Sequence, residues 1–280
     1  MSLRIIIDSG SDILLDEADK LGVIHLPLKV VFDGAEYLDS VNLSHKEFYE
    51  KLVESDVLPT TCQITPSDYA DALEKCGKDD VLIITLSGKL SGTFQSACIA
   101  SEEYDGNIAV VDSESVALGE RLIVLRAVEL RDSGKSLEEI YETLNEEKKR
   151  LRVLALLDTL EYLKKGGRIS KTVALAGAML SIKPVVTIEN GEVTMLGKAR
   201  GSRQGNNLLR ELVLKGNGID LSKPYCLAYS GLSDALLKKY IEDSADLWNH
   251  AADDLPIVTV GCTIGTHVGP GAIAVAFFEK

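Results

Sequence analysis

Residues 86–97 read LSGKLSGTFQSA, and this stretch decides how the surrounding chain folds. It follows Val81–Ile84, a short apolar run with the length and branching of a buried strand, and it leads into residues with helical apolar spacing. The small residues between strand and helix allow a tight turn, and Ser91 stands where it can cap the helix. A helix start offers free N–H groups and a partial positive charge, so this turn is suited to an anion. A purely structural capping role for Ser91 would account for the same pattern.

The order of strand, polar turn and helix occurs at two further places. Residues 5–7 form an apolar run before Asp8–Asp12 and a helical pattern over about 14–21, and residues 108–111 precede the polar stretch 112–115. Strands that alternate with helices predict a parallel α/β sheet. Because ligands bind outside the carboxyl ends of such strands, we expect the Asp- and Ser-rich turns to gather at one edge.

The second half of the chain has a different pattern. Residues 184–188 and 193–197 flank Glu189-Asn190-Gly191, which is a strong hairpin signal. Further strands interleaved with helices favour a mixed or antiparallel sheet. The sequence therefore predicts an α/β protein of two domains: residues 1–155 as a parallel α/β domain with a small β excursion near 25–40, and residues 156–280 as an α/β domain with a mixed or antiparallel sheet. The apolar, alanine-rich stretch 172–180 predicts another helix.

The composition excludes several classes of protein. A net charge of −13 argues against a general nucleic-acid or anionic-membrane surface, because both need basic patches. The five cysteines are scattered and form no C-x-x-C pair, which favours reduced thiols over disulfides or a zinc site. No apolar run approaches the roughly 20 residues that span a bilayer, and a strand begins too early to leave room for a signal peptide. We expect a cytoplasmic protein without stable membrane insertion.

Two more positions are candidates for binding. Thr61 lies in an extended segment just before a helix that Thr65 caps and Pro66 begins. His267 lies in residues 261–271, GCTIGTHVGPG, which we expect to form a loop whose glycines permit close backbone approach or positive φ. Such loops often carry binding residues. Local capping by Thr61 and a structural role for His267 remain open alternatives.

Taken together, six segments of the chain resemble the DegV family, the bacterial fatty-acid-binding proteins that serve fatty acid kinase. The segments are Asp8-Ser9 after the opening strand, 60–63 (TTCQ), 90–97 (LSGTFQSA), 160–170 (ending GGRIS), 182–184 (IKP) and 264–271 (IGTHVGPG). The resemblance implies a two-domain α/β protein with a long-chain fatty acid in a tunnel between the domains. It also implies a carrier that performs no chemistry itself, with no cofactor and no metal.

The resemblance assigns roles to particular residues. A Thr–Ser pair that hydrogen-bonds the acyl carboxylate corresponds to Thr61 and Ser91, with Thr266 and His267 close by. Cys62 stands where a serine is frequent in the family.

Three arginines are implicated on the phosphate or kinase side. The arginine of the Gly-Gly-Arg motif is Arg168, which could meet the charge of an acyl phosphate. The arginine linked to engagement of the fatty acid kinase corresponds to either Arg200 or Arg203. The implied partners are therefore a fatty acid and a fatty acid kinase, in a pathway of phospholipid synthesis.

The residue types suit this chemistry. Each buried methylene contributes about 0.8 kcal/mol, so a tail of about 16 carbons supplies on the order of 12 kcal/mol before costs. A buried carboxylate is costly unless it is hydrogen-bonded, and hydroxyls supply donors without adding charge. A protonated His267 would add positive charge.

An acyl-transfer enzyme or esterase is the alternative, with Ser91 as nucleophile and His267 as base. The sequence has no G-x-S-x-G elbow to support it. Cys62 as the nucleophile is a weaker form of the same idea. A DNA-associated regulator conflicts with the acidic balance.

Overall fold

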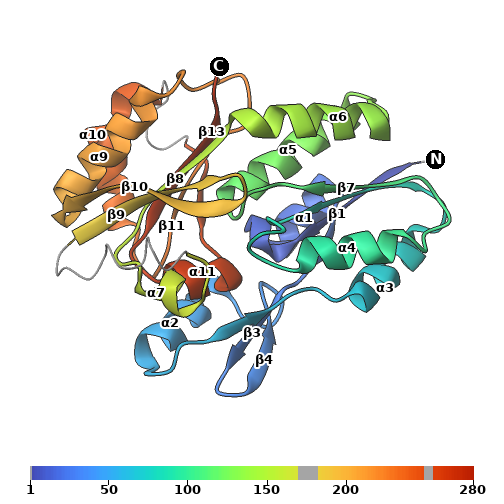
Figure 1. Cartoon of the computed structure of the whole chain (residues 1–280), viewed down its shortest axis with the longest axis horizontal. Coiled ribbons are helices and arrows are strands. Elements are labelled where there is room, and N and C mark those ends of the chain that lie inside the picture. Colours follow the sequence, from blue (N-terminus) through green and yellow to red (C-terminus); the bar gives the residue numbers. More distant parts are fainter. Residues whose placement is uncertain (1, 170–181, 249–254) are drawn as a thin grey trace.

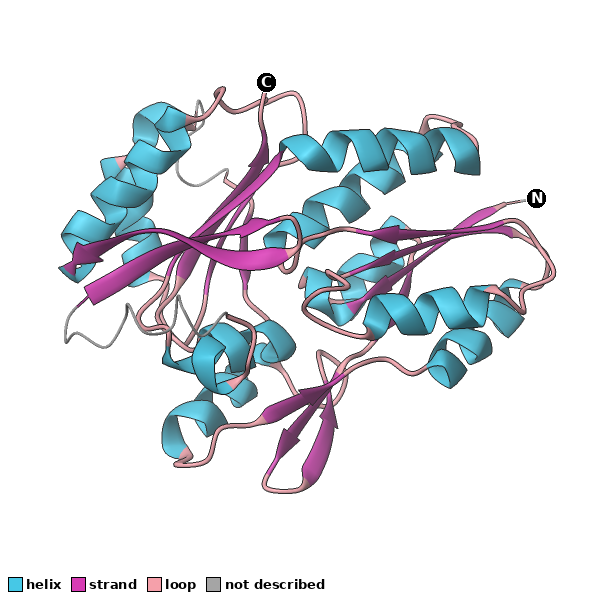
Figure 2. Ribbon diagram, viewed as in Figure 1, coloured by secondary structure: helices cyan, strands magenta, loops and turns pink. Residues whose placement is uncertain are grey.

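The computed structural model describes residues 2–169, 182–248 and 255–280, and in these the chain forms three β-sheets with helices around them (Figures 1 and 2). The first sheet is parallel and has the order β2-β1-β6-β7. Its strands are β1 (Leu3–Asp8), β2 (Ile24–Leu26), β6 (Asp80–Thr85) and β7 (Ile108–Asp112). The strands predicted at 5–7, 81–84 and 108–111 and their parallel pairing are confirmed.

The second sheet is mixed, with the order β10-β9-β8-β13-β11-β12. Its pairs are antiparallel except β11 with β12, which is parallel. Its strands are β8 (Leu151–Leu156), β9 (Ile182–Glu189), β10 (Glu192–Arg200), β11 (Cys226–Tyr229), β12 (Ile257–Thr259) and β13 (Ile273–Phe278). The predicted hairpin is confirmed, and Asn190 and Gly191 at its tip have φ of 50° and 80°, as a two-residue turn requires.

The predicted β excursion is a three-stranded sheet of its own. β3 (Lys29–Phe32) and β4 (Ala35–Leu38) form a hairpin, and β5 (Thr60–Cys62) pairs with β3 on the other side. The helix α2 (His45–Glu54) packs on it, and Ser44 and Glu47 form the capping box at its start. The small sheet lies below the two larger sheets in Figure 1, and its strand β5 carries Thr61, which pairs with Val30 of β3.

The remaining helices cover the two large sheets in layers. α3 (Pro66–Cys76) and α4 (Thr93–Ser101) lie on one side of the parallel sheet, and α9 (Gly201–Lys215) and α10 (Ala235–Asp243) lie on the outer side of the mixed sheet. α1 (Leu15–Leu21), α5 (Leu118–Asp132), α6 (Leu137–Glu147) and α7 (Glu161–Lys165) complete this set. α10 ends at Asp243, and a 3-10 turn over Ala245–Leu247 follows it.

α5 is the layer between the two large sheets. Its buried residues surround the helix rather than forming one stripe, and such a helix belongs in an interior. One hydrophobic cluster joins α5 to Ile5 and Leu82 of the parallel sheet and to Ala276 and Phe278 of the mixed sheet. The core is therefore continuous across the two halves.

The predicted boundary between residues 155 and 156 falls inside β8. All of β8 pairs with β13, and part of it also pairs with β9, so the chain enters the mixed sheet before residue 155. The division into domains at that point stays a prediction. The helix predicted over 172–180 lies outside the described residues. In the part of the chain that the structure describes, no helix combines the length and apolar character needed to cross a bilayer.

The glycine-rich segment 261–271 corrects an expectation. It contains the helix α11 (Cys262–Val268) rather than a loop. Gly265 lies inside this helix, whereas Gly261 and Gly269 flank it as N-cap and C-cap. A Cβ at 265 would lie only 2.7 Å from Phe48 Cε1 and from Tyr49 Oη, so the missing side chain lets α11 pack tightly on α2. Close helix packing thus accounts for Gly265, and positive φ accounts for Gly269 and Gly271.

Gly265→Ala should destabilise the protein by about 1–3 kcal/mol, because Phe48 and Tyr49 must move to admit the methyl group. Alanine favours an isolated helix by about 1 kcal/mol, so propensity alone predicts the opposite sign. The free energy of unfolding from denaturant titration measures the difference. Ser202→Ala on the exposed start of α9 is the control and should shift it by less than about 0.5 kcal/mol. A Gly265→Ala protein as stable as the unaltered chain would contradict the role assigned to this glycine.

Candidate functional site

An internal cavity of about 360 Å³ lies between the two halves of the chain, within the size range of small-molecule sites. Its wall is mostly apolar and comes from both halves, with Leu86, Val116 and Leu118 on one side and Val153, Val186 and Ile264 on the other. Four polar side chains that the sequence predicted also line it: Thr61, Ser91, Arg168 and His267. The cavity is therefore an apolar chamber with a cluster of donors at its wall.

Thr61 and His267 are joined directly, although 206 residues separate them in the chain. Thr61 on β5 and His267 near the end of α11 have their Oγ1 and Nε2 atoms 2.9 Å apart. The other ring nitrogen of His267, Nδ1, is buried and has no hydrogen-bond partner in the described part of the chain. It lies against Gly166, where a Cβ would be only 2.2 Å away. Close packing thus fixes the histidine ring with Nε2 toward Thr61.

His267 is neutral at pH 7 in this arrangement. Burial, together with the positive charge of Arg168, lowers its pKa from 6.5 to about 4. His267 would add positive charge only if it were protonated, and here desolvation and repulsion from Arg168 disfavour that form. What the ring offers at Nε2 is a hydrogen-bonding group.

Ser91 lies in the turn before α4, and its hydroxyl faces Thr93. The two hydroxyl oxygens are 2.9 Å apart, and Ser91 Oγ accepts a hydrogen bond of 3.3 Å from the backbone N–H of Thr93. The N-cap position itself is held by Gly92, so the prediction that Ser91 occupies it is corrected by one residue. Ser91 nevertheless reaches the first N–H of the helix and lines the cavity, which places a hydroxyl and a helix start together.

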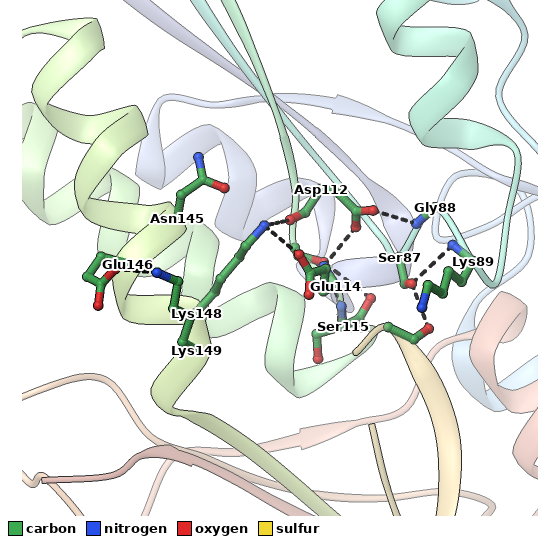
Figure 3. A network of polar contacts seen from close by, with 12 residues as sticks. Ser87, Gly88, Lys89, Asp112, Glu114, Ser115, Asn145, Glu146, Lys148 and Lys149 are labelled. Atoms are coloured by element: carbon green, nitrogen blue, oxygen red, sulfur yellow. Dashed lines mark hydrogen bonds and ion pairs between the residues drawn. The ribbon is translucent and has the colours of Figure 1, made fainter. Parts of the chain in front are cut away.

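The turn that carries Ser91 is held by contacts from the second half of the chain. Ser87 Oγ donates a 2.7 Å hydrogen bond to the carbonyl oxygen of Gly191 at the tip of the β9–β10 hairpin (Figure 3). Arg168 Nε donates to the carbonyl oxygen of Leu90 at 3.1 Å and Nη1 donates to that of Gly166 at 2.7 Å. The position of Ser91 therefore depends on both halves of the chain.

The same turn is braced on its other side. The Asp112 carboxylate accepts hydrogen bonds from the backbone N–H groups of Gly88 at 3.1 Å and Glu114 at 2.8 Å (Figure 3). Lys148 donates to the Asp112 carbonyl at 2.9 Å and forms an ion pair with Glu114. Ser87 and Asp112 are positioning residues that we did not predict. Ser87 belongs to the quoted stretch, but its partner Gly191 is 104 residues away and no local pattern reveals it.

Three candidate residues lie elsewhere. Thr266 is buried beside His267, but its hydroxyl donates to the carbonyl oxygen of Cys262 within α11 at 2.9 Å, and the residue does not line the cavity. Arg200 and Arg203 are exposed at the end of β10 and the start of α9 and do not line it either. The structure brings together Thr61, Ser91, Arg168 and His267, whereas a contact role for Thr266 has no geometric support.

The arrangement does not favour a Ser–His nucleophile. Within the described residues, no hydrogen bond joins Ser91 to His267, and the histidine bonds Thr61 instead. A catalytic histidine also needs a group that orients its second nitrogen. Here Nδ1 has no such partner among the described residues.

Comparison with known proteins agrees with this fold. The family model DegV, described as "Uncharacterised protein, DegV family", matches residues 2–280. A DegV domain-containing protein of Caldanaerobacter subterraneus subsp. tengcongensis is 35% identical over 288 residues, covering 99% of each chain. Another from Deinococcus radiodurans is 35% identical over 286 residues, covering 99% of this chain and 98% of the other.

Two solved structures superpose over the full length of both chains. The structure titled "Fatty Acid Binding of a DegV family Protein from Thermus thermophilus" has a TM-score of 0.85 at 32% identity, covering 100% of each chain. That titled "Crystal Structure of DegV, a fatty acid binding protein from Bacillus subtilis" has a TM-score of 0.82 at 30% identity, with the same coverage. The family match over nearly the whole sequence confirms the resemblance, and the chain belongs to the DegV family.

Proposed function

We propose that this protein binds a long-chain fatty acid, with the tail in the cavity and the carboxylate at Thr61, Ser91 and His267. The observation that carries the proposal is an apolar chamber whose polar groups are neutral hydrogen-bonding groups together with one arginine. An apolar wall excludes water from the tail, and hydrogen bonds to hydroxyls offset the cost of burying a carboxylate. The two relatives whose titles name fatty acid binding support the same ligand class.

We further propose that the protein is a carrier, which presents the bound carboxylate to a fatty acid kinase for acyl-phosphate formation. Hydroxyl donors need no rearrangement of charge when a phosphate is added, and Arg168 lies at the cavity wall where it could meet the added charge. Arg200 and Arg203 are exposed, and no ion pair within the described residues involves them, so both are available to an acidic partner surface. The five cysteines are free thiols, which supports a reducing, cytoplasmic location.

Fatty acid binding should weaken when the head-group donors are removed. Delipidated protein titrated with a long-chain fatty acid in a calorimeter should bind one equivalent, and Thr61→Val or Ser91→Ala should each lower the affinity by roughly 10- to 150-fold, because each loses a hydrogen bond to a charged group. Ser101→Ala, at the other end of α4, is the matched control, since its hydroxyl bonds the Cys98 carbonyl. If the unaltered protein binds no fatty acid, the ligand assignment is wrong; if both variants bind like the unaltered protein, the head-group assignment is wrong.

Substitution of Arg200 and Arg203 should distinguish fatty acid binding from presentation of the bound fatty acid to the kinase. Arg200→Ala and Arg203→Ala should leave fatty acid affinity unchanged, because neither residue lines the cavity. At least one of them should lower the rate of acyl-phosphate formation by a fatty acid kinase by about tenfold or more. The reason is that the substitution removes a positive charge that would contact an acidic surface of the kinase. Arg210→Ala, further along α9 and paired with Asp246, is the control. Normal turnover in both variants would remove these residues from the kinase interface.

His267 should give the ligand-free protein a measurable sensitivity to acid. Its pKa is about 4 in the folded protein and near 6.5 when unfolded, so between these values the unfolded chain holds a proton that the folded chain lacks. Stability from this residue is therefore complete above about pH 6.5 and decreases as the pH falls toward 4. Denaturant unfolding of delipidated protein across this range should show a larger loss for the unaltered chain than for His267→Gln. Parallel pH curves for the two proteins would show that the histidine is not buried in its neutral form.

A further inference from the structure

A second group of ligating side chains lies at the opposite end of α11 from His267. Asp39 follows β4, His45 begins α2 and Cys262 begins α11, and one ligand atom from each lies within 4.8 Å of the others. Asp39 and Cys262 are fully buried, whereas His45 is half-buried and lines a groove of about 850 Å³. None of the three lines the fatty-acid cavity. The group therefore serves some purpose other than contact with the ligand proposed above.

The side chains of this group converge on a small space. The hydroxyl oxygen of Ser40 is 3.1 Å from Asp39 Oδ1 and 3.1 Å from His45 Nε2. This one oxygen atom therefore bridges the carboxylate and the imidazole. A Cβ on Gly261 would lie 3.0 Å from His45 Nε2 and 2.8 Å from Asp12 Oδ1, so these two side chains approach the glycine too closely for any other residue to fit there. Asp12, which ends the turn after β1, therefore lies close to His45.

An unpartnered carboxylate oxygen of Asp12 is a second, independent observation that favours a bound cation here. It is 2% exposed and lines the groove with His45, and its Oδ2 has no hydrogen-bond partner in the described part of the chain. Its other oxygen accepts the backbone N–H of Gly261 at 2.9 Å. The nearby guanidinium of Arg121 is already paired with Glu17. Two buried carboxylates without a free counterion are costly, and a bound cation would offset that cost.

The candidate ligands are held in place by outer contacts, as metal ligands usually are. Asp39 accepts the backbone N–H groups of Cys262 at 3.3 Å and Thr263 at 2.9 Å, besides the Ser40 hydroxyl. A carboxylate has about four acceptor positions, so one remains for a metal. The ring of His45 interacts with the backbone carbonyl of Thr259, a partner that fixes the ring orientation.

We propose that Asp39, His45 and Cys262 bind a divalent transition-metal ion, with Zn²⁺ the best match, and that Asp12 supplies a second carboxylate next to the site. Imidazole and thiolate select zinc-like ions, whereas Mg²⁺ and Ca²⁺ prefer oxygen ligands alone. Binding would release the Cys262 thiol proton to solvent and replace its weak 3.5 Å contact with the Leu43 carbonyl. The ion would join α2 to the start of α11 and so fix the helix that carries His267.

The experiment titrates the full chain with metal after treatment with chelator and reductant. All proteins carry Cys62→Ser, because that exposed thiol could bind metal adventitiously. This parent protein should bind one equivalent of Zn²⁺, and Co²⁺ in its place should give the charge-transfer absorption of a Co²⁺–thiolate bond. His45→Gln and Cys262→Ser should each weaken Zn²⁺ binding by roughly 100-fold or more, and Cys262→Ser should abolish the thiolate absorption. His25→Gln and Cys226→Ser, which change a half-buried histidine and a buried cysteine outside the group, should behave like the parent.

Absence of stoichiometric Zn²⁺ binding by the parent protein would overturn the proposal, as would equal binding by His45→Gln and Cys262→Ser. Circular dichroism and fatty acid binding of each variant report whether the fold is intact. If a variant unfolds, the Co²⁺ spectrum of the parent decides, because a spectrum without the thiolate band excludes Cys262 as a ligand. The metal titration uses delipidated protein, so its result is independent of fatty acid binding.

Discussion

The packing of α11 against the small sheet and α2 is the constraint on which the rest of the structure depends. α11 belongs by sequence to the second half of the chain, yet its start is held by Asp12 and Asp39 of the first half, through the backbone N–H groups of residues 261–263. Tyr49 adds a hydrogen bond of 3.0 Å from its hydroxyl to the Val260 carbonyl. Because the helix is fixed in this way, Ile264 and His267 reach the cavity in one defined orientation.

Gly265 lets α11 pack closely on α2. The glycines of this segment are also the reason why the sequence predicted a loop there. Glycine is costly inside a helix and is usually taken as a sign of a loop. In α11 the cost is offset by close approach to Phe48 and Tyr49, which no local pattern can show because those residues lie more than 200 positions earlier in the chain. Tertiary packing thus overrides propensity here, and the loop prediction for 261–271 was wrong for that reason.

Helix starts and the hairpin turn were predictable because short local sequence patterns determine them. The capping residues Ser44, Thr65 and Ser136 each begin a helix with the box pattern that the sequence shows. The turn at Asn190-Gly191 closes the expected hairpin. By contrast, the bonds from Ser87 to Gly191 and from Thr61 to His267 join distant segments, so the sequence could place Thr61, Ser91 and His267 at one site only through the family resemblance. The contacts that hold those side chains form only when the two halves of the chain pack together, so local sequence patterns do not reveal them.

The electrostatics of the interior indicate how an acid could be held without a strong opposite charge. Burial raises the pKa of Asp8 to about 7 and that of Glu120 well above its usual range, and it lowers the pKa of His267 to about 4, so burial favours the neutral form of each of these groups. Hydrogen bonds to a carboxylate contribute about 1.5–3 kcal/mol each, which compares with the several kcal/mol lost when an ion leaves water. The head group then roughly balances its own cost, and the net affinity comes from the tail at about 0.8 kcal/mol per buried methylene. In such a site the shape of the apolar chamber, rather than the charge at its wall, decides which fatty acid binds best.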